Sequence, residues 1–203
     1  MTAEAAETAL TPDPADVAPP DPADLRQAMG MFASGVTVIT GTDGGEAVGF
    51  ACQAFASVSL EPPLILFCAD RGSRTWPRIR KSGRFSVNVL GEEQSDLCGR
   101  FGSSKGKKYD ELDWELSRWG TPALRDVLLR VHAEVSDVHV AGDHDVVIGR
   151  VLEVERGAER RPMVFFRGRF GIDHEADADQ ALFAPGLWGW ADQWDWDRAG
   201  HRE

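Results

Sequence analysis

The chain has 203 residues, 42% of them hydrophobic and 27% charged, values typical of one soluble domain with a substantial core. Its formal net charge of -11 at pH 7 excludes a protein that holds nucleic acid through basic patches. No run approaches the ~20 apolar residues of a membrane helix, and the first residues lack the basic start and apolar core of a secretory signal. The three cysteines have no metal-ligand spacing, so we expect packing thiols in a reducing cytoplasm and no metal site.

The N-terminal part divides into an arm and a helix. Residues 1–21 carry almost no large apolar side chains, so they cannot offset the entropy of ordering and predict a disordered arm. Asp24 can cap a helix over Leu25–Phe32, because apolar side chains recur there at helical spacing. Gly35 is predicted to end this helix, inside a domain that we place at residues 22–174.

Apolar and β-branched runs predict strands along most of the remaining chain. They are Val36–Thr40, Leu64–Ala69, Phe85–Leu90, Val127–Val140, Val146–Glu155 and Met163–Phe170, with helices expected at Arg74–Lys81 and Glu92–Phe101. Asp43-Gly44-Gly45 and Gly142-Asp143 mark turns, Ser73 can cap the first of these helices, and Gly83 can end it. Short strands joined by turns predict a mainly β, antiparallel barrel rather than a parallel βαβ sheet. No Gly-x-Gly-x-x-Gly loop indicates a Rossmann domain.

The stretch from Gly49 to Pro63 is unusually rich in small residues and lies between two predicted strands. Such a surface can accept a flat ligand, and Ser57 and Ser59 share a face if the segment is extended. Equally, small residues allow another backbone to pack closely, and composition alone favours this second interpretation.

Several motifs in a fixed order resemble the flavin reductases of two-component monooxygenases, over roughly Leu25 to Ile172. They are Phe32-Ala33-Ser34-Gly35-Val36-Thr37-Val38, Gly49-Phe50-Ala51-Cys52-Gln53-Ala54-Phe55-Ala56-Ser57-Val58-Ser59-Leu60, Pro62-Pro63-Leu64, Ser73-Arg74-Thr75, Gly83-Arg84-Phe85-Ser86-Val87-Asn88-Val89-Leu90, Gly142-Asp143-His144 and Phe166-Arg167-Gly168-Arg169-Phe170. The resemblance implies an FMN-binding split β-barrel that reduces FMN with NADH. FAD and NADPH are the alternative cofactors. It also implies a homodimer that releases reduced FMN, by diffusion, to a separate oxygenase acting on aromatic or steroid-type rings.

The same resemblance implies a site. The flavin ring would be lined by Ala51, Cys52, Gln53, Ala54 and Phe55. A helix N-terminus, hydroxyls and a guanidinium bind phosphate well, so the phosphate is expected at Ser73, Arg74 and Thr75, with Ser57 and Lys107 as further contacts.

The nicotinamide side of the site is expected at His144, with Asp143 beside it. His144 would position the nicotinamide rather than transfer a proton, because hydride passes directly between the two cofactors. Arg167 and Arg169 flank Gly168 on one predicted strand, so they share a face and Arg167 can bind a cofactor phosphate. Each of these motifs also has a plain structural role as cap, hairpin tip or surface ion pair.

Two other functions remain open. One is a pyridoxamine-phosphate-oxidase-like or deazaflavin-dependent oxidoreductase on the same barrel, and the other is a flavin carrier or sensor without turnover. The tail, residues 175–203, holds Trp188, Trp190, Trp194 and Trp196, which predict either packing on its own domain or contact with a second subunit.

Overall fold

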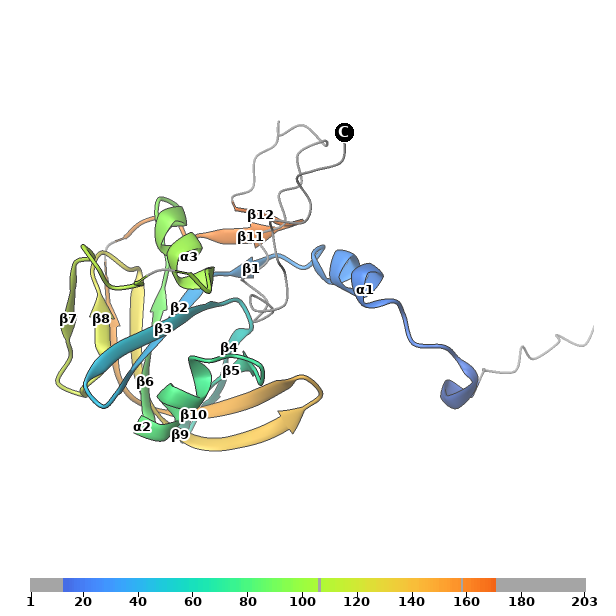
Figure 1. Cartoon of the computed structure of the whole chain (residues 1–203), viewed down its shortest axis with the longest axis horizontal. Helices are drawn as coiled ribbons and strands as arrows, with labels where there is room; N and C mark the ends of the chain where they lie inside the picture. Colours follow the sequence, from blue (N-terminus) through green and yellow to red (C-terminus); the bar gives the residue numbers. More distant parts are fainter. Residues whose placement is uncertain (1–12, 106, 158, 171–203) are drawn as a thin grey trace, which may run out of the picture.

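The core of the protein is one curled antiparallel sheet (Figure 1). A computed structural model describes residues 13–105, 107–157 and 159–170. Seven strands pair in the order β3-β2-β6-β9-β10-β5-β4. Their bounds are β2 Thr37–Asp43, β3 Glu46–Cys52, β4 Phe55–Leu60, β5 Pro63–Asp70, β6 Arg84–Val89, β9 Leu129–Ala141 and β10 His144–Arg156.

The two edges of this sheet meet at one corner. β3 and β4 lie at opposite ends of the strand order, yet only Gln53 and Ala54 separate them in the chain. The Cys68 amide of β5 donates to the Ala54 carbonyl at 2.9 Å, which fastens this corner to the far side of the sheet. A sheet whose edges are joined this way must curl, so the predicted mainly β, antiparallel split-barrel architecture is confirmed.

Two tight hairpins set the register as predicted. Gly44 and Gly45 have φ angles of 58° and 91° and connect β2 to β3 with Asp43 opposite Glu46. Gly142, with φ of 65°, begins the turn between β9 and β10. Both turns require backbone conformations that glycine adopts at little cost.

Two helices pack on the sheet. α2, Trp76–Ser82, lies against β2 and buries Trp76 and Ile79. It ends at Gly83 in the left-handed conformation, as predicted. α3, Ser95–Gly102, lies against β3 and buries Cys98 and Phe101. The inner core of the sheet includes Ile39, Phe67, Trp76, Phe85 and Val147, and a second core under α3 includes Val38, Leu90, Phe101, Leu124 and Met163.

The predicted helix starts are wrong by two or three residues. α2 and α3 begin at Trp76 and Ser95 rather than Arg74 and Glu92. The first helix, α1, spans Pro22–Met29 instead of Leu25–Phe32, and Asp21, not Asp24, caps it by accepting from the Ala23 amide. Proline fits the first helical turn, where its missing N–H is not needed, so Asp21-Pro22 starts the helix. Gly30 rather than Gly35 follows its end.

The predicted strand Met163–Phe170 is also wrong, because it contains a turn. β11, Val164–Phe166, and β12, Arg169–Phe170, form a hairpin whose turn residues Arg167 and Gly168 have φ of 51° and 78°. β1, Ser34–Gly35, pairs with β11 to complete a small separate sheet. β7, Trp114–Leu116, and β8, Pro122–Leu124, form a second small sheet that the sequence analysis did not predict.

The N-terminal segment stands apart from the body of the protein in Figure 1. A short 3₁₀ turn, η1, covers Pro14–Asp16, and α1 contains no buried residue. Residues 1–12 and the tryptophan-rich segment 175–203 lie outside the described residues, so the predictions for the arm's start and for the tail stay predictions. Among the described helices, none has the length and apolar character needed to span a membrane.

Candidate functional site

An open pocket of about 420 Å³ lies at the corner where the two sheet edges meet. This volume falls within the usual range for small-molecule sites. One wall comes from the segment between α1 and β2, and the other from the β3–β4 corner and β5. Its lining residues are Phe32, Ala33, Ser34, Gly35, Thr37, Gln53, Ala54, Phe55, Ala56 and Leu66.

Three residues predicted to line a flat ligand do line this pocket: Gln53, Ala54 and Phe55. Ala51 and Cys52 do not, because their side chains are only 2% and 3% exposed and belong to the two cores. Burial raises the pKa of the Cys52 thiol to about 12, which keeps it neutral as a packing group. The small residues Ala51 and Cys52 of β3, the strand behind the pocket, therefore serve close backbone packing rather than ligand contact.

Gly49 shows the same close packing. A Cβ atom at this position would lie 2.9 Å from the Ile39 carbonyl oxygen and 2.9 Å from the Phe101 ring. Lys108 also fixes this region, since its Nζ donates to the carbonyls of Gly49 and Phe101 at 3.1 Å. The small residue at position 49 thus lets α3 and the following loop approach β3.

Gln53 is the polar feature of the pocket. It is 9% exposed, and its Nε2 is buried without a hydrogen-bond partner in the described part of the chain. Thr37, the neighbouring polar group, is already bonded, because its Oγ1 donates to the Cys52 carbonyl at 2.7 Å. The pocket therefore has mostly apolar walls and one buried amide with unused hydrogen-bonding capacity.

The turn predicted for the nicotinamide contacts the loop that follows β5, through Arg71. The backbone of Arg71 donates to the Asp143 carbonyl at 3.0 Å, and its guanidinium donates to the Gly142 carbonyl at 3.4 Å. His144 pairs with Asp70 in the sheet, and its Nδ1 lies 2.7 Å from Oδ1 of Asp143. The turn at 142–144 is thus docked on the loop that leads into Ser73.

Around α2, the predicted phosphate residues already make protein contacts. Ser73 Oγ accepts from the amides of Thr75 and Trp76 at 3.2 and 3.3 Å. The predicted cap is nevertheless wrong by two residues, because Thr75 is the N-cap of α2. Exposed Arg74 donates to the Ser104 carbonyl at 3.2 Å. Exposed Lys107 lies 3.6 Å from Asp110 in a surface ion pair.

Two expectations about shared faces are wrong. The β4–β5 pairing places Ser57 opposite Ile65 but Ser59 opposite Leu64, so a bulge turns the two hydroxyls to opposite faces. Arg167 lies in the β11–β12 turn and does not share a strand with Arg169. Its amide donates to the Gly30 carbonyl and its guanidinium covers the Phe166 ring, with Nε 3.2 Å from Met31 Sδ, so it lies beside the α1 end of the pocket wall.

Comparison with known proteins decides the family. Residues 29–172 match the flavin reductase-like domain, a span that contains the whole curled sheet and every residue lining the pocket. The chain belongs to the flavin reductase-like family. The sequence resemblance is therefore confirmed at the level of the family.

Relatives of this flavin reductase-like protein are named as a monooxygenase reductase subunit, an FMN reductase and a monooxygenase component. It is 47% identical over 154 residues to the reductase subunit HsaB of a flavin-dependent monooxygenase from Rhodococcus jostii, covering 75% of this chain and 79% of that one. It is 38% identical over 149 residues to the FMN reductase (NADH) SmoA of Agrobacterium fabrum, covering 72% and 83%. The crystal structure of nitrilotriacetate monooxygenase component B from Mycobacterium thermoresistibile matches with a TM-score of 0.72 at 42% identity, covering 78% and 91%.

The pocket of this flavin reductase-like protein fits the ring of a flavin. A flat ring system needs apolar walls and a few polar groups for its nitrogen and oxygen atoms. Phe32, Phe55 and Leu66 provide such walls, and Gln53 provides the unpaired amide. Phe32 is 75% exposed, so a bound ring would cover apolar surface that water now contacts. Phe32 belongs to the first motif of the resemblance, but no ligand contact was predicted for it.

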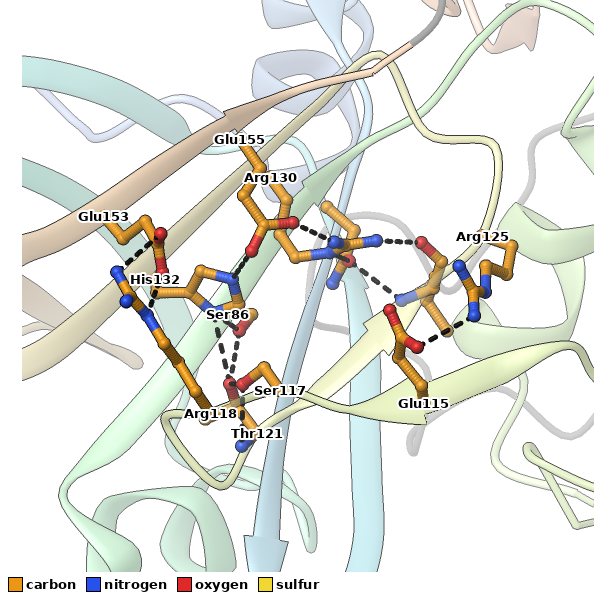
Figure 2. Close-up of polar contacts among 12 residues, drawn as sticks. Ser86, Glu115, Ser117, Arg118, Thr121, Arg125, Arg130, His132, Glu153 and Glu155 are labelled. Carbon is orange, nitrogen blue, oxygen red and sulfur yellow. Dashed lines mark hydrogen bonds and ion pairs between the residues drawn. The ribbon is translucent and has the colours of Figure 1, made fainter.

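Figure 2 shows a second group of linked polar side chains, which has a buried centre and a more exposed rim and was not predicted from the sequence. We call it the His132 cluster: Ser86, Ser117, Arg118, Thr121, Arg130, His132, Glu153 and Glu155. His132 is fully buried, with Nδ1 2.7 Å from Ser86 Oγ and Nε2 2.8 Å from Glu155 Oε1. The sequence signal for this cluster was His132 itself, a histidine in the interior of a predicted strand.

The His132 cluster is internally satisfied rather than built for a ligand. Its serine, histidine and glutamate are linked as in a hydrolase, but Ser86 and His132 are both 0% exposed, so no substrate reaches them. Ligand atoms of His132, Glu153 and Glu155 lie within 4.8 Å of one another, which also resembles a cation site. Both carboxylates, however, already accept from guanidiniums, Glu153 from Arg118 and Glu155 from Arg130. A divalent cation would lie beside two positive charges, which disfavours its binding. The hydrogen bonds of the cluster instead hold β6, β9, β10 and the β8 segment together.

Proposed function

We propose that this protein is an NADH-dependent flavin reductase that reduces FMN and supplies reduced FMN to a separate flavin-dependent oxygenase acting on aromatic or steroid-type rings. The observation that carries the proposal is the pocket with its unpaired Gln53 amide, in a chain of the flavin reductase-like family. The relatives named as a monooxygenase reductase subunit and as an FMN reductase (NADH) support both the cofactors and the oxygenase.

The ring would lie in the pocket, against Gln53, Ala54 and Phe55. Bound flavin would supply the acceptor for one hydride, a proton with two electrons, from the nicotinamide. The protein's task would be to bind and orient the two cofactors and to exclude water. Small side chains at the β3–β4 corner let backbone amides approach the ring, where they would stabilise negative charge.

The polar loops beside β5 would hold the charged and reacting ends of the cofactors. Arg74 would bind the flavin phosphate through its guanidinium, and Ser73, Thr75, Ser57 and Lys107 would be further contacts. Asp143 fixes the His144 ring through Nδ1, which lets the imidazole position the nicotinamide. Arg167, whose Nε lies beside Met31 Sδ, would bind a cofactor phosphate that extends past the Phe32 wall.

Steady NADH consumption tests the enzyme. Flavin-free protein should oxidise NADH only after FMN is added, and faster with FMN than with FAD. NADH loss without added flavin would contradict the proposal, and flavin binding without NADH loss would indicate a carrier or sensor. Turnover with pyridoxamine phosphate or a deazaflavin, but not with FMN, would indicate the other barrel enzymes.

Reduced FMN is proposed to reach the oxygenase by diffusion. An oxygenase separated from this protein by a membrane that passes only small molecules should still hydroxylate its substrate, at low yield because oxygen consumes free reduced flavin. Catalase should remove the peroxide by-product without abolishing the product. Hydroxylation that requires mixing of the two proteins would contradict diffusion and indicate docking.

A homodimer is proposed from the apolar surface of the N-terminal segment. Leu25 and Met29 of α1 and the following Met31 and Phe32 are 48%, 46%, 55% and 75% exposed, so one short segment carries four partly exposed apolar side chains. Leu25→Glu with Met29→Glu should shift the sedimenting species toward the monomer. Leu116→Glu, at another exposed apolar position, is the control and should leave the mass unchanged. A monomeric wild-type protein would contradict the proposal.

The three cysteines are free thiols, two of them buried. Free thiols are typical of a reducing compartment, so we place the reaction in the cytoplasm, where NADH is available. The native cells can be fractionated to test this location. Detection of the protein in a membrane or secreted fraction would contradict it.

A further inference from the structure

The unpaired amide of Gln53 has a defined place in the fold. It projects from the two-residue corner that joins the opposite edges of the sheet. Hydrogen bonds fix this corner, because the Phe55 amide donates to the Gln53 carbonyl at 2.8 Å and the Cys68 amide donates to the Ala54 carbonyl at 2.9 Å. The side chain is therefore carried on a rigid support, and its position does not depend on a mobile loop.

Burying a donor without an acceptor destabilises a folded protein, so most buried polar atoms are paired. Among the described residues, Nε2 of Gln53 is the buried side-chain nitrogen or oxygen atom that lacks a partner. An apolar side chain of similar size would fill the same space without that cost. The amide is thus best explained by a hydrogen bond that forms when the pocket is filled.

The chemistry of the amide indicates what it recognises. A carboxamide presents one donor and one acceptor side by side in a plane, and a half-turn of its last bond exchanges them. Its complement is an imide edge, in which an N–H lies next to a carbonyl oxygen. The pyrimidine ring of the isoalloxazine carries this edge at N3 and its two flanking carbonyls. The edge at N5 of the oxidised ring instead presents two acceptors, which match two donors rather than an amide.

We propose that the Gln53 side chain hydrogen-bonds the imide edge of the isoalloxazine and thereby sets the orientation of the flavin in the pocket. The inference rests on the proposed flavin reduction and assigns a role to one side chain within it. Gln53 is a positioning residue: it contacts the cofactor at the end of the ring system remote from the reacting N5 atom.

The test measures binding of FMN and of N3-methyl-FMN to the full chain by quenching of flavin fluorescence. The wild-type protein should bind FMN about tenfold more tightly than N3-methyl-FMN, about 1.4 kcal/mol, because the methyl group removes the imide donor. In Gln53→Met the affinity for FMN should fall about tenfold, and the preference for FMN should disappear. Equal affinities in the wild-type protein, or an unchanged preference in Gln53→Met, would overturn the proposal.

Urea unfolding of the flavin-free proteins separates recognition from support of the fold. Gln53→Met should unfold at the same or a higher urea concentration than the wild type, because it removes an unpaired buried donor. Gln94→Met is the matched control: Gln94 accepts from the Gly91 amide at 2.9 Å and its Nε2 donates to the Arg125 carbonyl, so the variant should unfold earlier and keep the FMN preference. If Gln53→Met unfolds earlier and loses both flavins equally, Gln53 supports the fold and the proposal is wrong.

These measurements are independent of turnover. If the wild-type protein distinguishes the two flavins but never oxidises NADH, the flavin reductase proposal fails and the role of Gln53 stands. If it oxidises NADH with FMN but Gln53→Met behaves as the wild type, only the role of Gln53 fails.

Discussion

The pocket and the His132 cluster both bury polar side chains on the same curled sheet, but their hydrogen bonding is opposite. His132 is fully buried and both of its ring nitrogens have partners. Gln53 is 9% exposed and its Nε2 has none in the described residues. Residue types alone therefore do not reveal a site. A serine, histidine and glutamate in contact form a structural network here, whereas a single amide without a partner indicates where a ligand binds.

The largest expected effect comes from breaking the His132 cluster. His132→Ala should lower the free energy of unfolding by about 2–5 kcal/mol, because it leaves a cavity and removes the partners of Ser86 and Glu155. Urea unfolding measures this loss, and the folded fraction should bind FMN as the wild type does. The control, His139→Ala, removes a histidine that is 63% exposed and should change stability by less than about 0.5 kcal/mol. If His132→Ala bound FMN weakly and kept the stability of the wild type, the His132 cluster would have a ligand role and its assignment as a structural network would be wrong.

The next largest effect is expected on FMN affinity, at the predicted phosphate site. Arg74→Ala should weaken FMN binding by about 1–3 kcal/mol, the usual contribution of a hydrogen bond to a charged group. Riboflavin, which lacks the phosphate, should bind nearly as before, and calorimetric titration of both flavins checks this. Arg80→Ala, which removes another exposed cation from the same region, should leave both affinities unchanged. If FMN and riboflavin lose affinity equally, the contact of Arg74 with the Ser104 carbonyl is its role, and that role is structural.

A smaller effect is expected at the nicotinamide side. His144→Ala should slow reduction of bound FMN by NADH about tenfold, about 1.4 kcal/mol in the barrier, or raise the NADH concentration needed for the same rate. Stopped-flow measurement of flavin reduction over a range of NADH concentrations distinguishes the two. FMN affinity should be spared, because the ring pocket does not include His144. His139→Ala on the same hairpin serves as the control, and a wild-type rate in His144→Ala would leave His144 as a turn residue.

The smallest effect is a pH dependence within the His132 cluster. The Trp119 indole N–H, and then the Arg118 guanidinium, lower the pKa of the Glu153 carboxyl below its ordinary 4.5. Because the folded pKa is the lower one, Glu153 stabilises the fold above the unfolded pKa, and this contribution is lost as the pH falls through the folded pKa. The gap in urea midpoint between the wild type and Glu153→Gln should therefore shrink on acidification below pH 4.5. A gap that stays constant or widens would contradict the assignment.

Much of the fold could be predicted because its signals are local. Alternation of apolar residues gave the long strands, and Gly44, Gly45 and Gly142 gave the two hairpins, since positive φ is a property of single residues. The helix starts could be placed only within two or three residues, because capping competes among neighbouring polar side chains. Arg167 could not be placed at all from local pattern, because its turn conformation accompanies a hydrogen bond to Gly30, far away in the chain.

The order of the motifs along the chain was enough to predict the family and to assign Gln53, Ala54 and Phe55 to the candidate site. Which buried polar groups have hydrogen-bond partners follows from tertiary packing alone. The partners of His132 lie 46 residues away at Ser86 and 23 residues away at Glu155, so no local pattern reports them. The missing partner of Gln53 is likewise a property of everything packed around it. Hydrogen-bond satisfaction depends on atoms that the fold brings together, whereas strand and turn propensities depend on neighbours along the chain.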